Sequence, residues 1–176
     1  MYSVVLIIAG TGYQPEEYKQ TKKALEEQDI NVLTASDITP SAIAEDETRT
    51  EVDMSLSQVD MKKYDGVFFL GGVGAEKYLN NSLSYNIAVS AMQEDKLYGA
   101  MQVSTRILAR AGVLKHKEAT GWDEDDRLKS ILEQNDAKYN EEEPVVVSGD
   151  AITAVNSESA PHFGAAIANK LHAKSD

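Results

Sequence analysis

The sequence predicts an α/β fold, a three-layer sandwich with a mostly parallel central sheet. Continuous apolar runs at Tyr2–Ala9 and Val67–Leu70 are typical of strands buried on both faces of such a sheet. Segments with helical spacing of apolar residues alternate with these runs along the chain. The 176 residues, 42% of them hydrophobic, suffice for one domain with a full core, and we expect a single domain over 1–176.

The first elements form a βαβ unit. Tyr2–Ala9 is a β-branched strand, and Gly10–Gly12 turns the chain. Pro15 opens a helix with early acidic residues, which we expect to end near Gln28. Ile30–Ala35 reads as the next parallel strand, with a right-handed connection.

The remaining elements continue the alternation after one interruption. Residues 36–60 break the pattern, and the alternation in Thr48–Leu56 predicts short strands or a hairpin outside the main sheet. Beyond this excursion we expect strands at Val67–Leu70, Leu97–Met101, Glu118–Thr120, Val145–Ser148 and Ile152–Val155, and helices at Ser84–Gln93, Arg127–Asn135 and Ser159–Leu171. The last two strands pair across a Gly149-Asp150 turn. Together these elements favour flavodoxin-like layering.

The stretch Lys96–Gly112 contains the joint that matters most for function. A buried strand should end near Met101, and a helix should begin around Ser104 with Ser104 or Thr105 as its N-cap. Ligands of open α/β sheets bind at this carboxyl edge. Enzymes with a nucleophile elbow hold the reactive residue on such a sharp turn. The residue here is Gln102, and an amide is no nucleophile.

Composition narrows the classes of function. The formal net charge is −12, from 29 acidic and 17 basic residues, so nucleic acid is not an expected partner. A well-solvated surface explains the acidity more simply than a high-salt habitat. The chain has no cysteine, which removes disulfides, thiolate metal sites and a cysteine nucleophile. The three histidines are isolated, so we expect no metal site, although a site built from carboxylates alone stays open.

No apolar run is long enough to span a bilayer, and Met1–Gly10 lacks the basic start of a leader peptide. We therefore expect no membrane association and a cytoplasmic protein. Neither glycine cluster, at 10–12 or 71–74, fits a phosphate-binding pattern. We expect no cofactor, while a flavin or nucleotide site remains an alternative on this type of fold.

Three segments resemble the ThiJ/PfpI superfamily, which has the class I glutamine amidotransferase-like fold. Tyr13–Tyr18 is similar to that family's acidic helix start. Tyr64–Gly72 (YDGVFFLGG) is similar to its YDxxxxPGG segment, with Leu70 where proline is usual. Gly99–Leu108 resembles its elbow, A-[IV]-C-x-[GS]-x-x-x-L, and the helix at Phe163–Leu171 fits as well.

The resemblance implies a homodimer or larger oligomer. Members of the family include cysteine-dependent glyoxalases, deglycases, amidases and peptidases, as well as stress chaperones. Their chemistry uses the elbow cysteine, a glutamate from the first helix and backbone N–H groups as an oxyanion hole. Many members add a histidine. By position, the glutamate is Glu17, the nucleophile position is Gln102, and the two histidine positions are Val103 and Trp122. The glycine pair is Gly71 and Gly72.

The glutamate and glycine positions each have two readings. We hypothesise that the Gln102 amide donates a hydrogen bond to the Glu17 carboxylate and fills the pocket that is catalytic in the family's enzymes. The alternative is that Glu17 is a first-turn acid that complements the helix dipole. Gly71 and Gly72 can offer N–H donors to an anion or simply make a tight turn.

The residues after the elbow also have structural and functional readings. Ser104 and Thr105 can be substitute nucleophiles, but no histidine matches to activate them, and helix capping is favoured. Arg106 should form a surface ion pair, or else bind an acidic group of a partner. Trp122 either walls the pocket or closes the core edge, and the acidic run 123–126 is expected to be a solvated helix start.

These observations favour a non-catalytic binding or stress-related protein that keeps the family scaffold. A small-molecule ligand at the sheet edge is the third class of function. The alternative is an enzyme of the family's hydrolase (intracellular protease or amidase), glyoxalase or deglycase class, if residue 102 is naturally cysteine or another mechanism operates.

Overall fold

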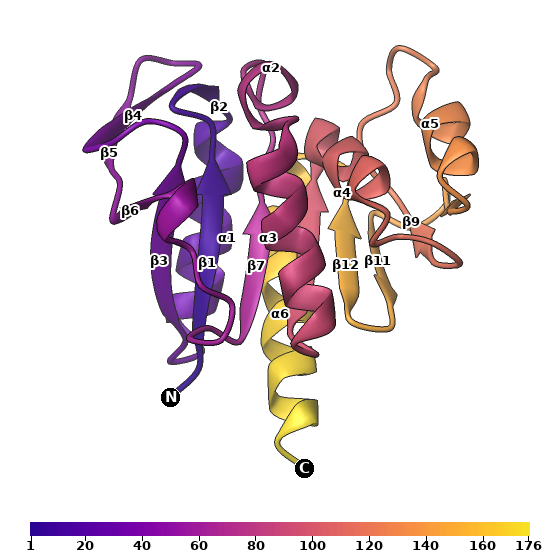
Figure 1. The fold of residues 1–176 in the computed structure, drawn as a ribbon. Helices are drawn as coiled ribbons and strands as arrows, with labels where there is room; N and C mark the ends of the chain where they lie inside the picture. Colours follow the sequence, from indigo (N-terminus) through magenta and orange to yellow (C-terminus); the bar gives the residue numbers. More distant parts are fainter.

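The computed structural model describes residues 1–176 and is built around one seven-stranded sheet in the order β11-β12-β8-β7-β1-β3-β6 (Figure 1). Its strands are β1 (Ser3–Ile8), β3 (Asn31–Ser36), β6 (Met54–Ser55), β7 (Gly66–Phe69), β8 (Leu97–Met101), β11 (Val145–Ser148) and β12 (Ala151–Ala154). Every neighbouring pair is parallel except β11 and β12, which form the predicted antiparallel hairpin.

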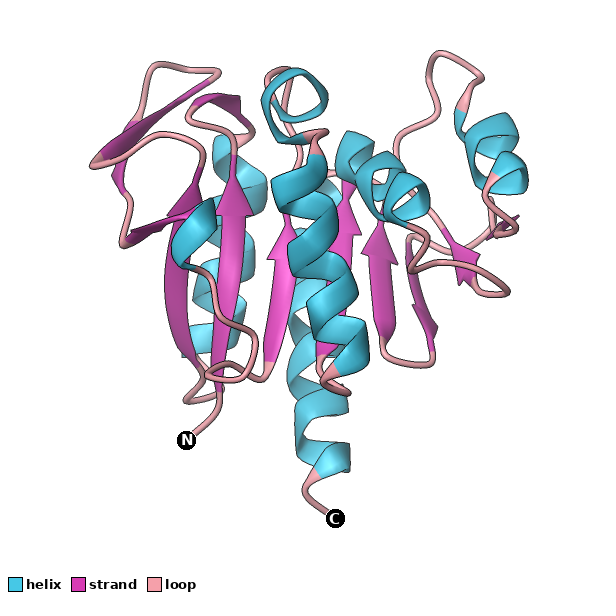
Figure 2. Cartoon of the chain, in the orientation of Figure 1, coloured by secondary structure: helices cyan, strands magenta, loops and turns pink.

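Helices cover both faces of this sheet, which confirms the three-layer α/β architecture (Figure 2). The helices are α1 (Pro15–Glu26), α2 (Ala75–Leu79), α3 (Ser82–Gln93), α4 (Thr105–Ala111), α5 (Leu128–Gln134) and α6 (Ala160–Lys174). α1 and α6 pack together on one face, and α3 and α4 pack together on the other. Because the parallel strands point the same way, their carboxyl ends meet at one edge, where the site lies.

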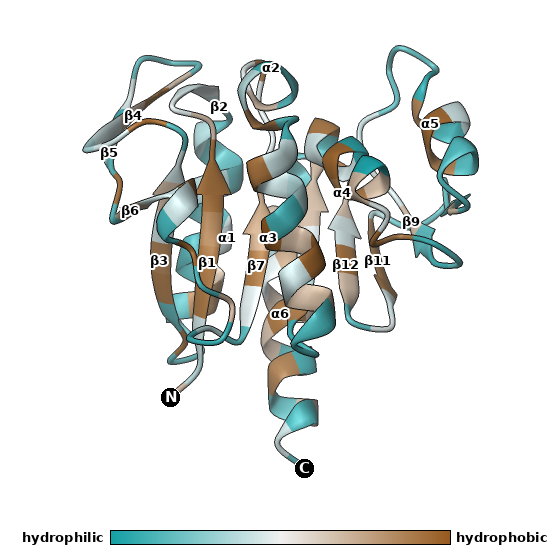
Figure 3. Ribbon diagram, viewed as in Figure 1, coloured by the Kyte–Doolittle hydropathy of each residue, from teal (hydrophilic) through white to brown (hydrophobic).

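The core follows from the apolar runs of the central strands, which Figure 3 shows as brown ribbons. Val4–Ile8 of β1 and the whole of β7 and β8 are buried. The long helices close the outer layers; α6 comes close to α1 at Gly164, where an added Cβ would lie 2.6 Å from the Ala24 Cβ. This tight packing fixes α1, and with it the glutamate that α1 carries into the site.

The alternating segment Thr48–Leu56 lies only partly outside the main sheet, because β6 at its end pairs with β3, contrary to the prediction. The rest of the excursion joins a short strand from before α1 in a small second sheet outside the main one, as predicted. Its strands are β2 (Thr11–Tyr13), β4 (Ser41–Ala44) and β5 (Arg49–Glu51), in the order β2-β4-β5. β4 and β5 are antiparallel, and β2 pairs parallel to β4. The loop after β4 therefore lies close to the segment that leads into α1. A two-stranded sheet of β9 (Glu118–Ala119) and β10 (Lys138–Tyr139) lies near the other end of the main sheet.

The helix after β8 begins where the sequence predicts, with Ser104 as its N-cap residue and α4 starting at Thr105. A single 3-10 turn over Gln102–Ser104, which was not predicted, connects it to the strand. The short elements β2, α2 and β10 were not predicted. No helix of the structure is both long and apolar enough to cross a bilayer.

Candidate functional site

Gln102 occupies a strained turn at the carboxyl end of β8. Its φ angle is +57°, in the left-handed region that residues other than glycine rarely adopt. The preceding Met101 is extended, and the following residues coil directly into α4. The predicted elbow is therefore present, and it presents the side chain of Gln102 at the edge of the sheet.

Glu17 reaches the same place from the first turn of α1. It is fully buried, and its Oε1 accepts a hydrogen bond from the N–H of Gly71 at 2.9 Å, while its Oε2 has no partner. Burial raises the pKa of Glu17 to about 8; the Gly71 N–H opposes this shift and the carboxylate of Glu45 adds to it. Glu17 is thus largely protonated at neutral pH, and it is no simple first-turn acid.

The loop after β7 presents three consecutive backbone N–H groups, each held by a different side-chain oxygen. Gly71 N–H donates to Glu17, Gly72 N–H donates to the Oε1 of Gln102 at 2.6 Å, and Val73 N–H donates to the Oε1 of Glu45 at 2.8 Å. These acceptors come from α1, the elbow and the loop after β4. The side chains of the protein itself therefore occupy the donors of this loop.

The hypothesis of a Glu17–Gln102 hydrogen bond is wrong in its direct form. Each side chain bonds to a different N–H of the glycine pair, because Gly71 lies between them: a Cβ at Gly71 would be 2.2 Å from the Gln102 Oε1 and 2.8 Å from the Glu17 Oε1. The tight turn predicted at the glycine pair is present, because Gly72 turns the chain at φ +130°, which only glycine adopts readily. The two N–H groups donate to side chains of the protein itself and not to an anion.

Ser104 is the N-cap residue of α4, as predicted, but neither Ser104 nor Thr105 makes a capping hydrogen bond with its hydroxyl, and both side chains are fully buried. The Ser104 hydroxyl donates to the Leu70 carbonyl at 2.7 Å, and the Thr105 hydroxyl donates to the Thr120 carbonyl at 2.8 Å. Carbonyls at the ends of neighbouring strands bind these hydroxyls more readily than the helix terminus, because those carbonyls would otherwise be buried without a partner. Ser104 thus links the elbow to the end of β7, and Thr105 links it to the end of β9.

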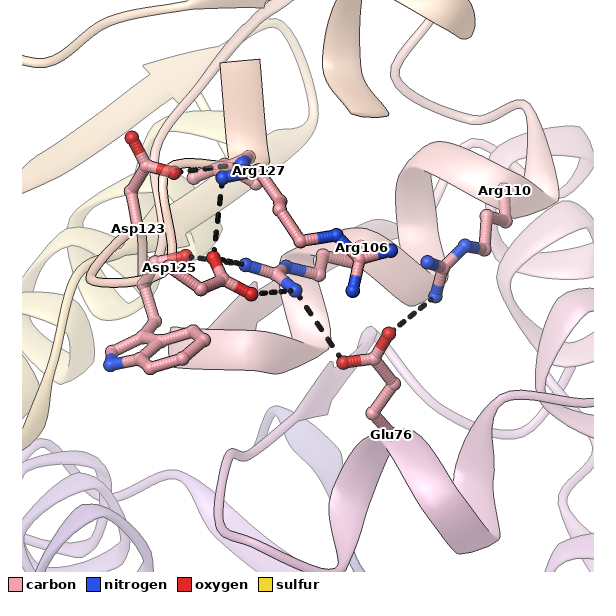
Figure 4. Close-up of polar contacts among 8 residues, drawn as sticks. Glu76, Arg106, Arg110, Asp123, Asp125 and Arg127 are labelled. Carbon is pink, nitrogen blue, oxygen red and sulfur yellow. Dashed lines mark hydrogen bonds and ion pairs between the residues drawn. The ribbon is translucent and has the colours of Figure 1, made fainter. Parts of the chain in front are cut away.

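Arg106 is only 1% exposed, so the prediction of a surface ion pair is wrong. Its guanidinium donates two hydrogen bonds to Asp125, at 2.6 and 3.0 Å, and lies 3.6 Å from Glu76 (Figure 4). Arg110 holds the other oxygen of Glu76 at 3.2 Å. The hydrogen bond from Arg106 lowers the pKa of Asp125. The pairing is within one chain and links α2, α4 and the loop before α5.

The acidic run before α5 is partly structural and not only a solvated helix start. Asp125 binds Arg106, and the Oδ1 of Asp123 accepts a hydrogen bond from the N–H of Leu128, the first residue of α5, at 2.7 Å. Arg106 also donates to the Trp122 carbonyl at 3.3 Å, and its guanidinium carbon lies 5.1 Å from the centre of the indole ring. Arg106 therefore positions both the backbone and the ring of Trp122.

A cleft of about 340 Å³ opens beside the elbow, lined by Gly72, Val73, Glu76, Gln102, Val103 and Trp122. Trp122 therefore forms a wall of the cleft, which is one of the two roles predicted for it. Two residues of the site, Glu45 and Glu76, were missed by sequence reasoning, because nothing marks them among 29 acidic residues. A larger hollow of about 720 Å³ runs along the outer side of α1, away from the elbow, among lysines and acids.

Comparison with known proteins gives consistent results. The model of the DJ-1/PfpI family matches residues 3–170. An uncharacterised protein of Methanocaldococcus jannaschii, MJ0967, is 28% identical over 162 residues, which are 92% of this chain and 78% of that protein. An uncharacterised protein of Archaeoglobus fulgidus is 25% identical over 159 residues, 90% of this chain and 92% of the relative.

Solved structures agree in fold. A ThiJ/PfpI domain protein from Brachyspira murdochii superposes with a TM-score of 0.90 at 26% identity, covering 97% of this chain and 96% of the other. DJ-1beta of Drosophila melanogaster superposes with a TM-score of 0.86 at 26% identity, covering 97% and 90%.

Proposed function

The chain belongs to the DJ-1/PfpI family, and from this premise we propose that it is a non-catalytic member, a binding or stress-related protein that retains the scaffold and its cleft. In this proposal Gln102 stands at the position of the family's nucleophilic cysteine. Glu17, Gly71 and Gly72 keep the surrounding frame, and Val103 and Trp122 stand where a histidine would otherwise serve.

The observation that carries the proposal is the hydrogen bond from Gly72 N–H to Gln102 at 2.6 Å. Acyl-transfer chemistry needs backbone donors that are free to stabilise an oxyanion as it forms. Here the amide oxygen of Gln102 already occupies that donor, and the amide nitrogen is not nucleophilic. One side chain therefore both replaces the nucleophile and fills the donor site.

The cleft itself supports binding and not turnover. Its six lining residues include no histidine, cysteine, lysine or serine that could act as a base or a nucleophile. Glu76, the only ionisable residue among them, is held by Arg106 and Arg110. The apolar and aromatic walls remain suited to a small organic ligand at the sheet edge.

A second candidate, a cysteine-type hydrolase, glyoxalase or deglycase, is favoured by the geometry of the elbow. The φ angle of +57° at residue 102 and the protonated Glu17 beside it form the frame that such an enzyme would use. This candidate requires cysteine at residue 102 or a mechanism without a thiol.

The decisive experiment compares methylglyoxal consumption by the chain with consumption by Gln102→Cys and Gln102→Ala. We expect no turnover by the chain or by the alanine variant, and we expect the cysteine variant to consume the aldehyde. Turnover by the chain as it stands would refute the non-catalytic proposal. Absence of turnover in all three, with folding confirmed by circular dichroism, would exclude this substrate and the idea that residue 102 alone silences the cleft.

We further propose that the protein is a cytoplasmic homodimer or larger homo-oligomer, as the family resemblance implies. Size-exclusion chromatography with light scattering tests the oligomer directly, against a subunit mass of 19.2 kDa. A particle of that mass at micromolar concentration would refute this part of the proposal.

A further inference from the structure

The amide group of Gln102 has a fixed orientation. Its Oε1 must face the Gly72 N–H, because only the oxygen can accept that hydrogen bond. The Nε2 then carries two N–H donors that bond to no atom of the protein, and it is not one of the buried polar atoms that lack a partner. Gln102 lines the cleft, so it offers the cleft an oriented hydrogen-bond donor.

The cleft is poorly suited to an anion. Its loop would normally attract anions through the N–H groups of Gly71, Gly72 and Val73, but Glu17, Gln102 and Glu45 already hold them. Glu76 adds a carboxylate to the wall, and its two arginine partners balance its charge without facing the cleft as lining residues. An uncharged acceptor, such as a carbonyl oxygen, matches the free Nε2 better.

Glu76 offers the cleft a hydrogen-bond acceptor, whereas Gln102 offers it a donor. Its Oε1 lies 3.2 Å from Arg110, and its Oε2 lies 3.6 Å from Arg106. A carboxylate has about four acceptor positions, so others are left for a ligand. The Glu76 side chain is 34% exposed and lines the same cleft as Gln102. The cleft thus presents one donor group and one acceptor group, the complement of a primary carboxamide.

The third feature is the aromatic wall. Trp122 is half-buried, and Arg106 covers part of its ring from the protein side. Arg106 and Asp125 hold this wall in place, so a flat ligand meets a preformed surface. Val73 and Val103 supply apolar contacts on the remaining sides.

We propose that the cleft binds a planar, uncharged aromatic carboxamide, whose carbonyl accepts from Gln102 Nε2, whose NH₂ donates to Glu76, and whose ring packs on Trp122. This inference rests on the proposed binding function and names its ligand class. The amide of Gln102 is then the recognition group of the site, in addition to filling the place of a nucleophile.

Nicotinamide is the probe for the test, because it joins a primary carboxamide to a small aromatic ring. Trp122 is the only tryptophan, so its fluorescence reports on the cleft, and calorimetry gives an independent affinity. We expect a saturable fluorescence change with nicotinamide, and at least 10-fold weaker binding of nicotinate, which has the same ring with a carboxylate. 3-Methylpyridine, which lacks the carbonyl, should also bind at least 10-fold more weakly.

The matched variants are Gln102→Glu and Gln134→Glu. The first keeps an oxygen for the Gly72 N–H but replaces the donor by an acceptor; the second makes the same change on the exposed face of α5. We expect at least a 10-fold loss of nicotinamide affinity in Gln102→Glu and none in Gln134→Glu. Glu76→Gln, which alters the acceptor, should weaken nicotinamide binding by a smaller factor.

Three results would overturn the inference: no saturable response to nicotinamide in either assay, nicotinate binding as tightly as nicotinamide, or unchanged nicotinamide affinity in a folded Gln102→Glu variant. These failures differ from failure of the proposed function. Methylglyoxal turnover by the unmodified chain would refute the non-catalytic proposal alone, whereas loss of carboxamide binding would leave that proposal in place and remove this ligand class.

Discussion

Glu17 shows how one buried residue sets the electrostatics of the site. It is fully buried with one oxygen unpaired, a position that would be very costly for a carboxylate. The protonated form avoids most of that cost, which is why the pKa of Glu17 rises to about 8. The residue is therefore a neutral hydrogen-bonding group next to the elbow under ordinary conditions.

The shift gives Glu17 a predictable effect on stability against pH. Between the unfolded pKa of about 4.3 and the folded pKa of about 8, the folded state holds a proton that the unfolded state has lost. The free energy of unfolding should therefore fall as pH rises through this window, by up to roughly 1.4 kcal/mol per pH unit from this group. Glu17→Gln cannot ionise and should lack this component.

Urea unfolding at pH 5, 6.5 and 8 measures the effect, with Glu16→Gln, on the exposed side of the same helix turn, as the control. The stability of Glu17→Gln relative to the unmodified chain should improve steadily with pH, whatever its value at pH 5. A relative stability that is the same at all three pH values would contradict the buried, protonated state of Glu17.

At the scale of elements, the elbow depends on how closely neighbouring loops approach it. A Cβ at Gly72 would lie 2.3 Å from the Gly12 carbonyl oxygen and 2.6 Å from the Gln14 nitrogen, in addition to the strain of φ +130°. Gly112 ends α4 at φ +83°, but a Cβ there would meet nothing within 4 Å. A substitution at Gly112 therefore tests backbone strain alone, whereas a substitution at Gly72 tests backbone strain together with steric contact.

We expect Gly112→Ala to cost about 1 kcal/mol, the strain of a left-handed alanine. Gly72→Ala should cost more than about 3 kcal/mol, because the backbone of the loop before α1 cannot give way without moving Glu17. Chemical denaturation of both variants measures the difference. Equal losses would show that the loops around the elbow are loosely packed.

Arg106, which lies in α4, links three elements of the fold. It is 1% exposed and contacts Asp125 in the loop before α5 and Glu76 in α2. Removing one partner of a buried ion pair leaves the other charge poorly solvated, but Glu76 and Asp125 are each about one-third exposed and recover part of their hydration. The cost should thus lie below the upper end of the range for buried pairs.

We predict that Arg106→Met lowers the free energy of unfolding by about 2–3 kcal/mol and shifts the emission of Trp122 to longer wavelength, because the loop loosens. Arg110→Met removes a single, more exposed contact with Glu76 and should cost under about 1 kcal/mol, with unchanged emission. If the two variants behave alike, Arg106 does not fix the wall of the cleft.

At the scale of the whole molecule, the sequence predicts the elements that are long and apolar. β1, β7, β8 and β12 stand out because their side chains are largely buried, and β11 stands out because it is a run of valines that pairs with β12 across a glycine turn. Short elements without a continuous apolar run, such as β2 and α2, could not be predicted. Their backbone is held by neighbours distant in sequence, as the hydrogen bond from Gly74 N–H to the Gly12 carbonyl illustrates.

Some parts of the site could likewise be predicted from the sequence, and others could not. The elbow at Gln102 and the approach of Glu17 follow from local patterns and from the family resemblance. The partners of Ser104, Thr105 and Arg106 could not be foreseen, because each depends on a group 15 to 34 residues away that only the completed fold brings close. Local sequence patterns therefore predicted helix capping for Ser104 and Thr105 and a surface ion pair for Arg106.

The net charge of −12 acts on the molecule as a whole. Part of this charge lies in Glu141–Glu143, three exposed carboxylates that form no ion pair within the chain and border a hollow shared with Glu158. Repulsion between exposed like charges opposes the compact state, and salt screens it over about 10 Å at 0.1 M. The same screening weakens surface ion pairs such as Lys22–Glu26, but exposed pairs contribute little.

Because acidic residues outnumber basic ones by 29 to 17, we expect repulsion to dominate. The Tm should rise by roughly 3 °C or more between 20 and 500 mM NaCl. A variant with glutamine at 141, 142 and 143 should have a higher Tm in low salt and a smaller rise, whereas Lys62→Gln combined with Lys63→Gln, which removes exposed positive charge, should show a larger rise. Differential scanning calorimetry of the three proteins checks this order. A Tm that falls with salt, or the reverse order of the two variants, would mean that ion pairs and not net repulsion govern the surface electrostatics of this fold.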